Sequence, residues 1–549
     1  PQWQRLARTG TNHLIAISGL HIGLLALFGH LLGWALGSLL NLGVPRINAI
    51  YCASVTSLMF AYSYAALAGF SLPTQRALIM VALVQVNLLR RAPSSIVHSL
   101  AVALLIVLLL DPLASQDMGL WLSFGAVAWL AYAFVGRRQR EPWGSGLLRA
   151  QGVVFAGLLI PSLWLLQSTS LLAPLANLLA IPLVSFVLVP VLMLAALAYL
   201  CLGAGALSQG LLALAEIATQ GLWAWLSKVD AVFQGSQWHP PSELAIWSYG
   251  LGLVAVALLL MPKGLPGRWL GGVGLVAALL PNVAAKAPLT VTLLDVGQGL
   301  AAVVETPTNT LVYDTGPRYG ARFDAGAGII APYLKRRGIT HIDSLIVSHG
   351  DGDHAGGYAG LAATMPVRNL IVGATLEAAP NASNCLNRQR WQWQDIELLV
   401  FRRPLPGGVE PVSNNQSCLL QIRYRDQVVL FPGDIESNME QALLAQQLLP
   451  QAVTVVLAPH HGSLSSSSAA FVDWTRPDYV LYSAGFGNRY GHPHKDVRAR
   501  YQAAGAQALS SGESGAIQLV WTAAGGPQIT RERVRQKRYW FTVAPQAQR

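Results

Sequence analysis

Charged side chains are scarce in this sequence of 549 residues, because Asp, Glu, Lys and Arg together make up only 11% of it. A soluble globular protein carries about 25% charged residues, so the composition excludes an enzyme that is soluble along its whole length. The scarcity is uneven. Long apolar runs dominate up to about residue 285, whereas charged residues, His and Asn become common after it. We therefore predict a transmembrane domain over residues 1–285 and a soluble domain over residues 286–549.

The sequence also lacks an initiating methionine and a signal peptide, because it begins at Pro1. From this we expect a fragment whose N-terminal part is missing. Lys and Arg outnumber Asp and Glu by 37 to 26, which gives a formal net charge of +11. Such a charge favours polyanions such as nucleic acid or anionic lipid. Basic loops that orient membrane helices would account for much of it without any DNA.

Apolar runs of membrane-spanning length fill the first domain, since a span needs about 20 mostly apolar residues. We count about nine such runs, near residues 14–42, 48–70, 74–90, 95–110, 118–136, 150–168, 180–202, 244–262 and 266–281. Residues 205–228 carry Gln, Glu and Lys among apolar residues and predict an amphipathic helix on the membrane surface. The basic loops at residues 90–91 and 137–140 lie on one side, which the positive-inside rule places in the cytoplasm. Nine full crossings would then place residue 285 onward in the cytoplasm.

Several polar residues interrupt the apolar runs, where they are costly and often functional. His13, Ile17 and His21 are spaced at i, i+4 and i+8 and would share one face of a helix. Arg76 opens the third run, and Asn177 interrupts the seventh together with a proline. These residues predict a polar channel interior, with His13, Ser18, His21, Arg76 and Asn177 as the candidates. Ordinary hydrogen bonding between packed helices would explain any single one of them equally well.

The soluble domain alternates short apolar strands with polar turns. We predict strands over residues 289–294, 310–313, 341–347, 419–424, 427–431, 453–457 and 478–483, and a helix over residues 326–337. This alternation predicts sheets covered by helices, an α/β sandwich. Strand ends gathered at one edge of the sandwich would bring the polar turns together.

The turn richest in metal-binding side chains follows the strand at residues 341–347 and reads SHGDGDHAGG over residues 348–357. Four metal-capable side chains fall within six positions, and the glycines between them allow the backbone to bend sharply. Histidine nitrogen and carboxylate oxygen suit zinc, and a carboxylate-rich mixture also suits manganese. A plain polar surface turn is the alternative, although such a turn needs only a single Asp or Asn.

Three segments of the membrane domain resemble the ComEC-type competence channels, the inner-membrane proteins of bacterial DNA uptake. They are NHLIAISGLHI at residues 12–22, LWLSF at residues 120–124 and NLLAIPL at residues 177–183. The resemblance implies a multi-pass protein of the bacterial inner membrane whose helices form a pore for one DNA strand. It also implies a DNA receptor and a cytoplasmic helicase or motor as partners. That family usually carries an earlier membrane segment and an OB-like domain, which this sequence lacks.

The soluble domain resembles the metallo-β-lactamase fold through its His-x-Asp-x-Asp-His motif, a later Gly-Asp and later histidine motifs. The resemblance implies a site for two divalent cations, zinc or manganese, with ligand roles carried onto His349, Asp351, Asp353, His354, Asp434, His460, His461 and His492. It leaves open which of the last three histidines binds metal. Asp351 stands where many relatives have His, and the intermediate histidine ligand has no counterpart, residues 414–417 lying about where it is expected. Both departures leave the second ion's ligand set incomplete and favour harder metals such as manganese.

Two cations about 3.5–4 Å apart can activate water and clamp a phosphodiester during in-line displacement. The resemblance therefore makes Asp353 and His354 the candidate catalytic residues of a metal-dependent phosphodiesterase or nuclease, and the serines at 463 and 465–468 candidate phosphate contacts. Three functions stay open. The first is a channel for single-stranded DNA whose metal domain cleaves the incoming DNA, and the second is a channel whose metal domain only binds DNA. The third is a membrane-anchored hydrolase of a small ester or lipid without a channel.

Cysteine is rare as well, with four in the whole chain. Cys52 and Cys201 lie in apolar runs and are expected to be small buried residues. Cys385 lies in a polar segment and Cys418 at the head of a strand, and we predict a disulfide between them. Disulfides persist in the periplasm and are rare in the cytoplasm, so this pair predicts a periplasmic metal domain. That contradicts nine full crossings, and one re-entrant helix would reconcile the two. Two unrelated buried thiols are the alternative.

Overall fold

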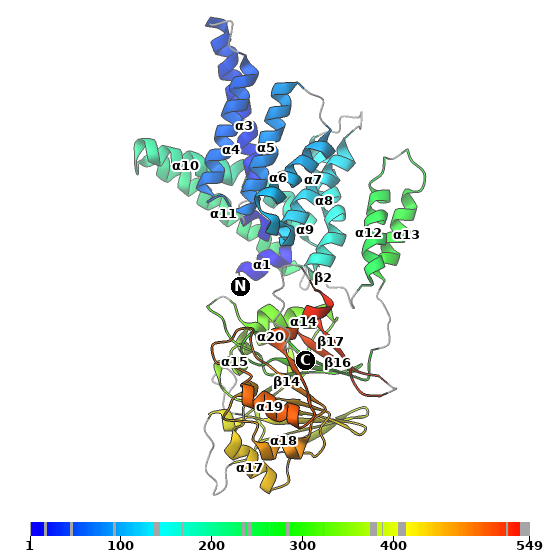
Figure 1. Ribbon diagram of the computed structural model, residues 1–549. Helices are drawn as coiled ribbons and strands as arrows, with labels where there is room; N and C mark the ends of the chain where they lie inside the picture. Colours follow the sequence, from blue (N-terminus) through cyan, green and yellow to red (C-terminus); the bar gives the residue numbers. More distant parts are fainter. Residues whose placement is uncertain are drawn as a thin grey trace. The chain divides into compact units, whose positions relative to one another are not determined.

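The computed structural model describes residues 2–15, 19–43, 48–91, 95–135, 143–166, 168–232, 237–238, 244–262, 264–280, 286–321, 323–373, 382–386, 388–404, 413–522 and 525–537. The chain divides into two compact units, Pro1–Asn282 and Val283–Arg549 (Figure 1). The described part of the first unit is helical apart from one pair of two-residue strands, whereas the second unit contains two larger β-sheets.

The helices of the first unit follow the apolar runs, and each of the nine predicted runs contains one. Their bounds are α1 (Gln2–Thr9), α2 (Asn12–Ile15), α3 (Gly19–Gly43), α4 (Ala49–Leu67), α5 (Leu72–Arg90), α6 (Ile96–Leu110), η1 (Pro112–Gln116), α7 (Met118–Phe134), α8 (Trp143–Leu165), α9 (Ala173–Leu183), η2 (Val184–Leu188), α10 (Val189–Leu202), α11 (Ala206–Val232), α12 (Ile246–Leu259) and α13 (Arg268–Leu279). The strands β1 (Thr169–Ser170) and β2 (Gln237–Trp238) pair antiparallel. The helix predicted over residues 205–228 is confirmed as α11.

Only some of these helices are long enough to cross a membrane. Among the described residues, five stretches have the required length and apolar composition: Gly19–Asn41, Ala49–Leu67, Leu72–Arg90, Gly144–Leu165 and Ala173–Leu202. The remaining predicted runs form α6, α7, α12 and α13, with 15, 17, 14 and 12 residues. These fall short of the roughly 20 residues of a straight crossing. The nine runs are therefore not nine full-length spans, and the parity argument built on them loses its basis.

The seventh run is not broken at its prolines, contrary to the expectation of an interrupted helix. α9, η2 and α10 form one helical stretch of 30 residues from Ala173 to Leu202. η2 is a π-helical segment between Pro182 and Pro190. A π-helical turn absorbs the backbone hydrogen bonds that proline cannot make, so the helix can continue past both prolines. Cys201, expected to be buried, is exposed at the end of α10.

Glycines spaced four residues apart allow α3 and α4 to approach closely (Figure 1). A Cβ atom at Gly33 would lie 1.9 Å from Thr56 Oγ1 and 2.5 Å from the carbonyl oxygen of Cys52. The Thr56 hydroxyl donates a hydrogen bond across the contact to the carbonyl oxygen of Gly29 at 2.7 Å. Lipid provides no hydrophobic force between helices, so close packing of small residues of this kind holds membrane helices together.

The histidines predicted to share one helical face lie in α2 and α3, on either side of residues 16–18. Those three residues lie outside the described part of the chain, so the shared face stays a prediction. His13 is exposed on the surface of its unit, whereas His21 is only 3% exposed. Ile17, the third member of the predicted face, lies outside the described residues.

In the second unit, the described strands form an eight-stranded and a seven-stranded sheet. The first has the order β17-β16-β3-β4-β5-β6-β7-β8, with bounds β3 (Leu289–Leu293), β4 (Ala302–Glu305), β5 (Thr310–Tyr313), β6 (Ile342–Val347), β7 (Val367–Val372), β8 (Ser383–Asn384), β16 (Ile517–Trp521) and β17 (Gln528–Arg531). The second has the order β15-β14-β13-β12-β11-β10-β9, with bounds β9 (Gln389–Trp393), β10 (Ile396–Phe401), β11 (Leu419–Tyr424), β12 (Gln427–Phe431), β13 (Val455–Leu457), β14 (Tyr479–Tyr482) and β15 (Gln507–Ser510).

Helices cover the outer face of each sheet. Their bounds are η3 (Gly326–Ile330), α14 (Ala331–Arg336), α15 (Gly352–Ala355), α16 (Tyr358–Thr364), η4 (Ser413–Gln416), α17 (Ser437–Ala445), η5 (Pro459–Gly462), α18 (Ala469–Thr475), α19 (Lys495–Ala503), α20 (Ser511–Ser514) and α21 (Glu532–Arg535). Figure 1 shows α17, α18 and α19 together on one side of this unit. The helix predicted over residues 326–337 is confirmed as η3 followed by α14.

Alternating side chains of each strand build three apolar cores. On β10, Leu398 and Val400 enter the core between the two sheets. Their neighbours Leu399 and Phe401 enter the core beneath α17, α18 and α19. A third core lies between the eight-stranded sheet and α14 and α16. This period of two is what a sheet buried on both faces requires. The structure thus confirms the predicted α/β sandwich.

Candidate metal centre

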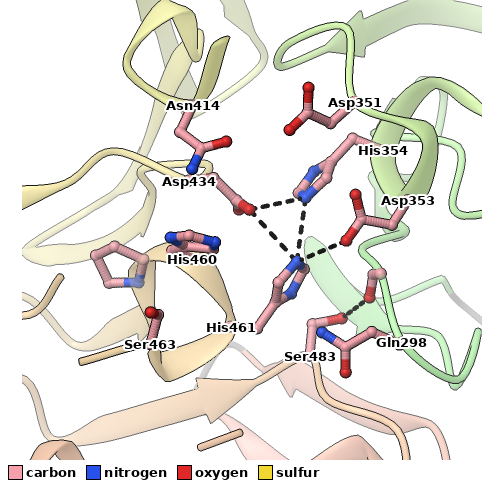
Figure 2. Close-up of polar contacts among 12 residues, drawn as sticks. Gln298, Asp351, Asp353, His354, Asn414, Asp434, His460, His461, Ser463 and Ser483 are labelled. Atoms are coloured by element: carbon pink, nitrogen blue, oxygen red, sulfur yellow. Dashed lines mark hydrogen bonds and ion pairs between the residues drawn. The ribbon is translucent and has the colours of Figure 1, made fainter. Parts of the chain in front are cut away.

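Polar side chains of both sheets gather where parallel strands end. β5 and β6 are parallel neighbours, and Asp314 and Ser348 follow them directly. In the other sheet β12, β13 and β14 are parallel and lead into Asp434, the pair His460–His461 and the loop that carries His492. Ligand sites of α/β proteins commonly form at such carboxyl ends. Figure 2 shows side chains from both sheets converging at this edge.

Two overlapping groups of potential metal ligands share His354. One comprises His349, His354 and Asp434, and the other Asp353, His354 and His461, with the ligand atoms of each group within 4.8 Å of one another. Nε2 of His354 is 3.1 Å from Asp434 Oδ2 and 3.2 Å from Nε2 of His461. Nε2 of His461 is 3.3 Å from Asp353 Oδ2 and 3.4 Å from Asp434 Oδ2 (Figure 2).

Asp314 sets the orientation of the shared histidine. Nδ1 of His354 donates to Asp314 Oδ2 at 2.8 Å, which turns Nε2 toward Asp434 and His461. Asp314 also accepts hydrogen bonds from the backbone N–H and the hydroxyl of Ser348, at 2.6 and 2.8 Å. The carboxylate is fully buried, and these three hydrogen bonds offset the free-energy cost of removing it from water. A carboxylate behind a metal-binding histidine is the usual means of fixing its tautomer and direction.

His349 has one ring nitrogen engaged and one that lacks a hydrogen bond. Its Nδ1 lies 3.0 Å from the hydroxyl of Ser348 and 3.3 Å from that of Ser417. Its Nε2 is buried and has no hydrogen-bond partner in the described part of the chain, the carboxylate of Asp351 being 3.5 Å away. A buried imidazole nitrogen without a partner is costly unless a cation or another donor reaches it. This nitrogen and the oxygen and nitrogen atoms opposite it fit a divalent cation.

The electrostatics of the cluster also favour positive charge at its centre. Burial alone would lower the pKa of His354, but the carboxylates of Asp434 and Asp314 on either side raise that pKa well above the usual histidine range. Burial tends to raise the pKa of Asp353, but a hydrogen bond from His461 and the charge of His354 bring it down to about 2. The same neighbours hold the pKa of Asp434 well below its usual range despite burial. The carboxylates therefore stay ionised at neutral pH and attract a cation.

Local backbone geometry places these ligands. His460 and His461 both adopt left-handed conformations, with φ of 48° and 57°, which are uncommon outside glycine. The turn directs His461 into the cluster, where it is 3% exposed, and leaves His460 partly exposed at its edge. Gly299 has φ of 131°, and a Cβ there would lie 2.4 Å from the carbonyl oxygen of Asp353. Glycine at this position therefore lets the loop after β3 pack against the backbone that carries Asp353.

Not all predicted ligands join the two groups. Asp351 is half exposed, and its carboxylate lies 3.5 Å from Nε2 of His349. His460 lies 3.2 Å from the hydroxyl of Ser465 through Nδ1. The ring of His492 stacks 6.4 Å from that of His461, and burial together with the neighbouring imidazoles lowers the pKa of His492 to about 4. These three residues surround the cluster without entering either group.

The serines suggested as phosphate contacts are largely occupied in holding the fold. The hydroxyl of Ser466 donates to the carbonyl oxygen of Pro459, and that of Ser468 accepts from the N–H of Phe471 as the cap of α18. The buried carboxylate of Glu440 accepts from the N–H groups of Ser467 and Ser468, at 2.6 and 2.8 Å. Only the side chains of Ser463 and Ser465 remain at the exposed edge of the cluster.

The structure joins Cys385 and Cys418 as a disulfide, with Cα atoms 5.9 Å apart and both residues fully buried. Cys418 directly follows Ser417, and both its N–H and its carbonyl oxygen form hydrogen bonds to residues beside the centre. Its N–H donates to the carbonyl oxygen of Ser348, and its own carbonyl oxygen accepts from the Tyr313 hydroxyl at 2.6 Å. The bridge thus fixes the segment that brings Ser417 against His349.

Three of the channel candidates are buried inside the first unit. Arg76 is 4% exposed and donates to Asp117 Oδ2 at 2.8 Å. Nδ1 of His21 is 3.5 Å from the Tyr64 hydroxyl. Asn177 is 8% exposed, and its Oδ1 lacks a partner among the described residues. His13 is exposed, and Ser18 lies outside the described residues.

Two residues of the centre were not singled out by the sequence. Asp314 reads as an ordinary strand-to-turn residue, and only its place at the end of the strand beside β6 would have revealed it. Ser417 lies in the segment 414–417, about where the intermediate histidine ligand was expected, and its hydroxyl accepts from the N–H of Asp434 at 3.0 Å as well as facing His349. A hydroxyl in that place orients ligands rather than adding one.

Comparison with known proteins divides the chain in the same way. A family model for competence proteins matches residues 1–263, and one for the metallo-β-lactamase superfamily matches residues 294–485. Competence protein ComA of Neisseria gonorrhoeae is 33% identical over 98% of this chain and 74% of its own length. Recombination protein 2 of Haemophilus influenzae is 31% identical over 91% of this chain and 66% of its own length. Among solved structures, the diiron β-hydroxylase CmlA of Streptomyces venezuelae is 16% identical over 50% of this chain and 60% of its own, with a TM-score of 0.30.

The adjacent histidines 460 and 461 provide a matched test of the ligand set. We expect His461→Ala to lower the bound manganese or zinc of the purified full-length chain, because it removes a nitrogen shared between Asp353 and Asp434. His460→Ala should leave the metal content unchanged. Elemental analysis after dialysis measures both. Equal loss in the two variants, or loss only in His460→Ala, would contradict the assignment.

Proposed function

Because the chain belongs to the competence protein family, we propose that it acts in bacterial DNA uptake during natural transformation. The membrane unit would admit one strand through the inner membrane, and the second unit would act on the incoming DNA. The observation that carries this proposal is the combination of five membrane-length helices with a buried histidine–carboxylate centre in one chain. A DNA receptor and a cytoplasmic helicase or motor would be its partners.

The centre suits hydrolysis of a phosphodiester. His349, His354 and Asp434 would hold one cation, and Asp353 and His461 would hold a second one that also contacts His354 and Asp434. Bound divalent cations supply a nucleophile at neutral pH and neutralise charge on a phosphodiester. Asp353 is the most exposed of these ligands, so its carboxylate would accept a hydrogen bond from the attacking water and orient it.

The donor set favours manganese over zinc. Asp351 occupies a position where histidine would add a nitrogen, and Ser417 faces His349 where another imidazole was expected. Without those two imidazole nitrogens, carboxylate oxygens make up a larger share of the donors, and carboxylate is a harder donor that suits manganese better. Two ions would bind, with the second held mainly by Asp353 and His461.

The path for the strand would use the buried polar groups of the first unit. Arg76 and Asp117 form a charged pair in which the arginine is almost fully buried. His21 and Asn177 each contribute a buried polar atom without a partner among the described residues. Ionisable and polar groups within membrane proteins face the interior or a water-filled route because lipid cannot solvate them.

The two histidines that flank β6 give a direct test of the phosphodiesterase proposal. We expect His354→Ala or Asp353→Ala to reduce manganese-dependent hydrolysis of DNA by the purified full chain. The reduction should exceed the roughly 10- to 100-fold loss that follows removal of a residue that only supports a metal ligand. His341→Ala should keep wild-type activity, since His341 pairs with Asp343 at the opposite end of the strand. Undiminished hydrolysis in either ligand variant would refute the catalytic assignment.

The disulfide supports a periplasmic position for the second unit. We expect Cys385 and Cys418 to resist alkylation in unreduced, denatured protein from the native membrane and to react after reduction. Cys52 and Cys201 are free and serve as the internal control, because they should react once the protein is denatured. Mass spectrometry of the alkylated peptides counts the modified thiols. Full alkylation of Cys385 and Cys418 without reduction would remove this support.

A further inference from the structure

The loop between β14 and α19 begins and ends at the metal centre. At its start, the Ser483 hydroxyl donates to the carbonyl oxygen of Gly299 at 2.6 Å, next to the backbone of Asp353 (Figure 2). At its end, the ring of His492 lies 6.4 Å from that of His461, with 23° between the planes. Side chains that project from this loop therefore stand at the rim of the centre.

The loop is held in one shape by the side chain of Asn488. Its Oδ1 accepts from the N–H groups of His492 and Tyr490, at 3.0 and 3.2 Å, and its Nδ2 donates to the carbonyl oxygen of His492. The N–H of Gly485 donates to the side-chain oxygen of Gln298 at 3.4 Å. These hydrogen bonds fix the backbone of the loop, so the side chains between them are held in an outward position.

Two aromatic rings on this loop face solvent. Phe486 is 55% exposed and Tyr490 is 54% exposed, whereas Tyr313, Phe431 and Tyr482 of the same unit are fully buried. Exposed apolar area costs roughly 25 cal/mol for each Å², so a fixed loop that presents two rings is explained best by a ligand that covers them.

Cationic side chains accompany both rings. The Arg489 guanidinium lies 4.9 Å from the Tyr490 ring centre and donates to its hydroxyl at 2.7 Å. The Arg533 guanidinium lies 5.9 Å from the Phe486 ring centre. Arginine offers five donors in a planar fork, so a single bond to a phenol leaves others for an anion.

The exposed ring of Tyr490 is the outer end of a stack that leads to the ligands. Tyr490 and His492 are 5.7 Å apart with 25° between their planes, and His492 continues to His461 in the same way. A planar group laid on Tyr490 would extend this stack outward, with the Tyr490 and His492 rings between it and His461. Aromatic faces with adjacent arginines are the means by which proteins hold unpaired bases and their phosphates.

We propose that Phe486 and Tyr490 form a base-stacking subsite for unpaired nucleotides at the rim of the metal centre, with Arg489 contacting the backbone phosphate. The subsite makes the centre selective for single-stranded over double-stranded nucleic acid, because bases within a duplex already stack on one another. This inference rests on the proposed action on DNA and names the form of DNA that the centre receives. An anionic lipid surface could contact the same arginines, but lipid headgroups have no planar ring to place on a stack that continues to a metal ligand.

The test uses the full chain in detergent and a fluorescein-labelled twelve-nucleotide thymidine strand, alone or paired with its complement. Anisotropy with EDTA present measures binding without cleavage. We expect Phe486→Ala and Tyr490→Ala each to weaken binding of the single strand by about 5- to 150-fold, the equivalent of the roughly 1–3 kcal/mol that one stacked base contributes. Binding of the duplex should not change.

Substitution by another aromatic residue is the matched control. Phe486→Trp and Tyr490→Trp should retain single-strand binding, whereas Phe486→Leu and Tyr490→Leu, which keep apolar area without an aromatic face, should not. Manganese content after dialysis should be the same in all variants, since none of them removes a proposed metal ligand. If the wild type does not hydrolyse the oligonucleotide, the proposed hydrolysis fails while the binding result still decides the subsite.

Single-strand affinity that is equal in the alanine variants and the wild type would overturn the inference. So would an equal loss of affinity for the single strand and the duplex, because that indicates a general phosphate contact. A third contrary result is unchanged oligonucleotide binding together with lost flotation on vesicles of phosphatidylglycerol, which would identify the rings as a membrane contact.

Discussion

The metal centre depends on one buried interaction, the hydrogen bond from His354 to the carboxylate of Asp314. His354 belongs to both ligand groups, so an error in its direction would disturb both at once. Asp314 can hold it because β5 and β6 are parallel neighbours whose ends lie side by side. The opposite sheet then has to deliver Asp434 and His461 to the same point, which the core between the sheets makes possible. The fold is thus the means of bringing five ligands from distant parts of the sequence together.

The arrangement also explains why the disulfide lies where it does. Ser417 must stay against His349 and Asp434, and it lies between η4 and β11 of the second sheet rather than in the motif itself. Cys418 follows it and is joined to Cys385 beside β8 of the first sheet. In the chain-entropy model a bridge that closes a loop of this length contributes about 3–4 kcal/mol to stability. The covalent link therefore connects the two sheets close to the point where the ligands meet.

The sequence predicted the architecture better than the details of the centre. Strands over residues 419–424 and 427–431 were predicted with the bounds that the structure has, because alternating apolar residues and flanking turns determine them locally. The motif from His349 to His354 could be identified as a candidate metal-binding turn from its composition and spacing, and the resemblance to the metallo-β-lactamase fold supplied the ligand roles. By contrast, the roles of Asp314 and Ser417 depend on contacts between strands far apart in sequence, which no local pattern contains.

In the membrane unit, apolar composition found a helix in each of the nine predicted runs but missed the short helices α1 and η1, and it overestimated how many helices could cross. α6, α7, α12 and α13 are as apolar as the long helices, yet end after 12 to 17 residues. Hydropathy records the polarity of a segment, whereas helix ends depend on caps such as Ser95 and Asp117, which accept backbone N–H groups at the first turns of α6 and α7.

Manganese anomalous scattering tests the central claim most directly, namely that the cluster around His354 positions cations and a phosphodiester together. The measurement would use crystals of the full chain with a single-stranded oligonucleotide that carries a hydrolysis-resistant phosphorothioate. The account predicts manganese in contact with His349, His354 and Asp434, further manganese at Asp353 and His461, and the phosphorothioate sulfur beside them. Manganese absent from these side chains in a complex that holds the oligonucleotide, or a phosphorothioate bound away from His354, would contradict it.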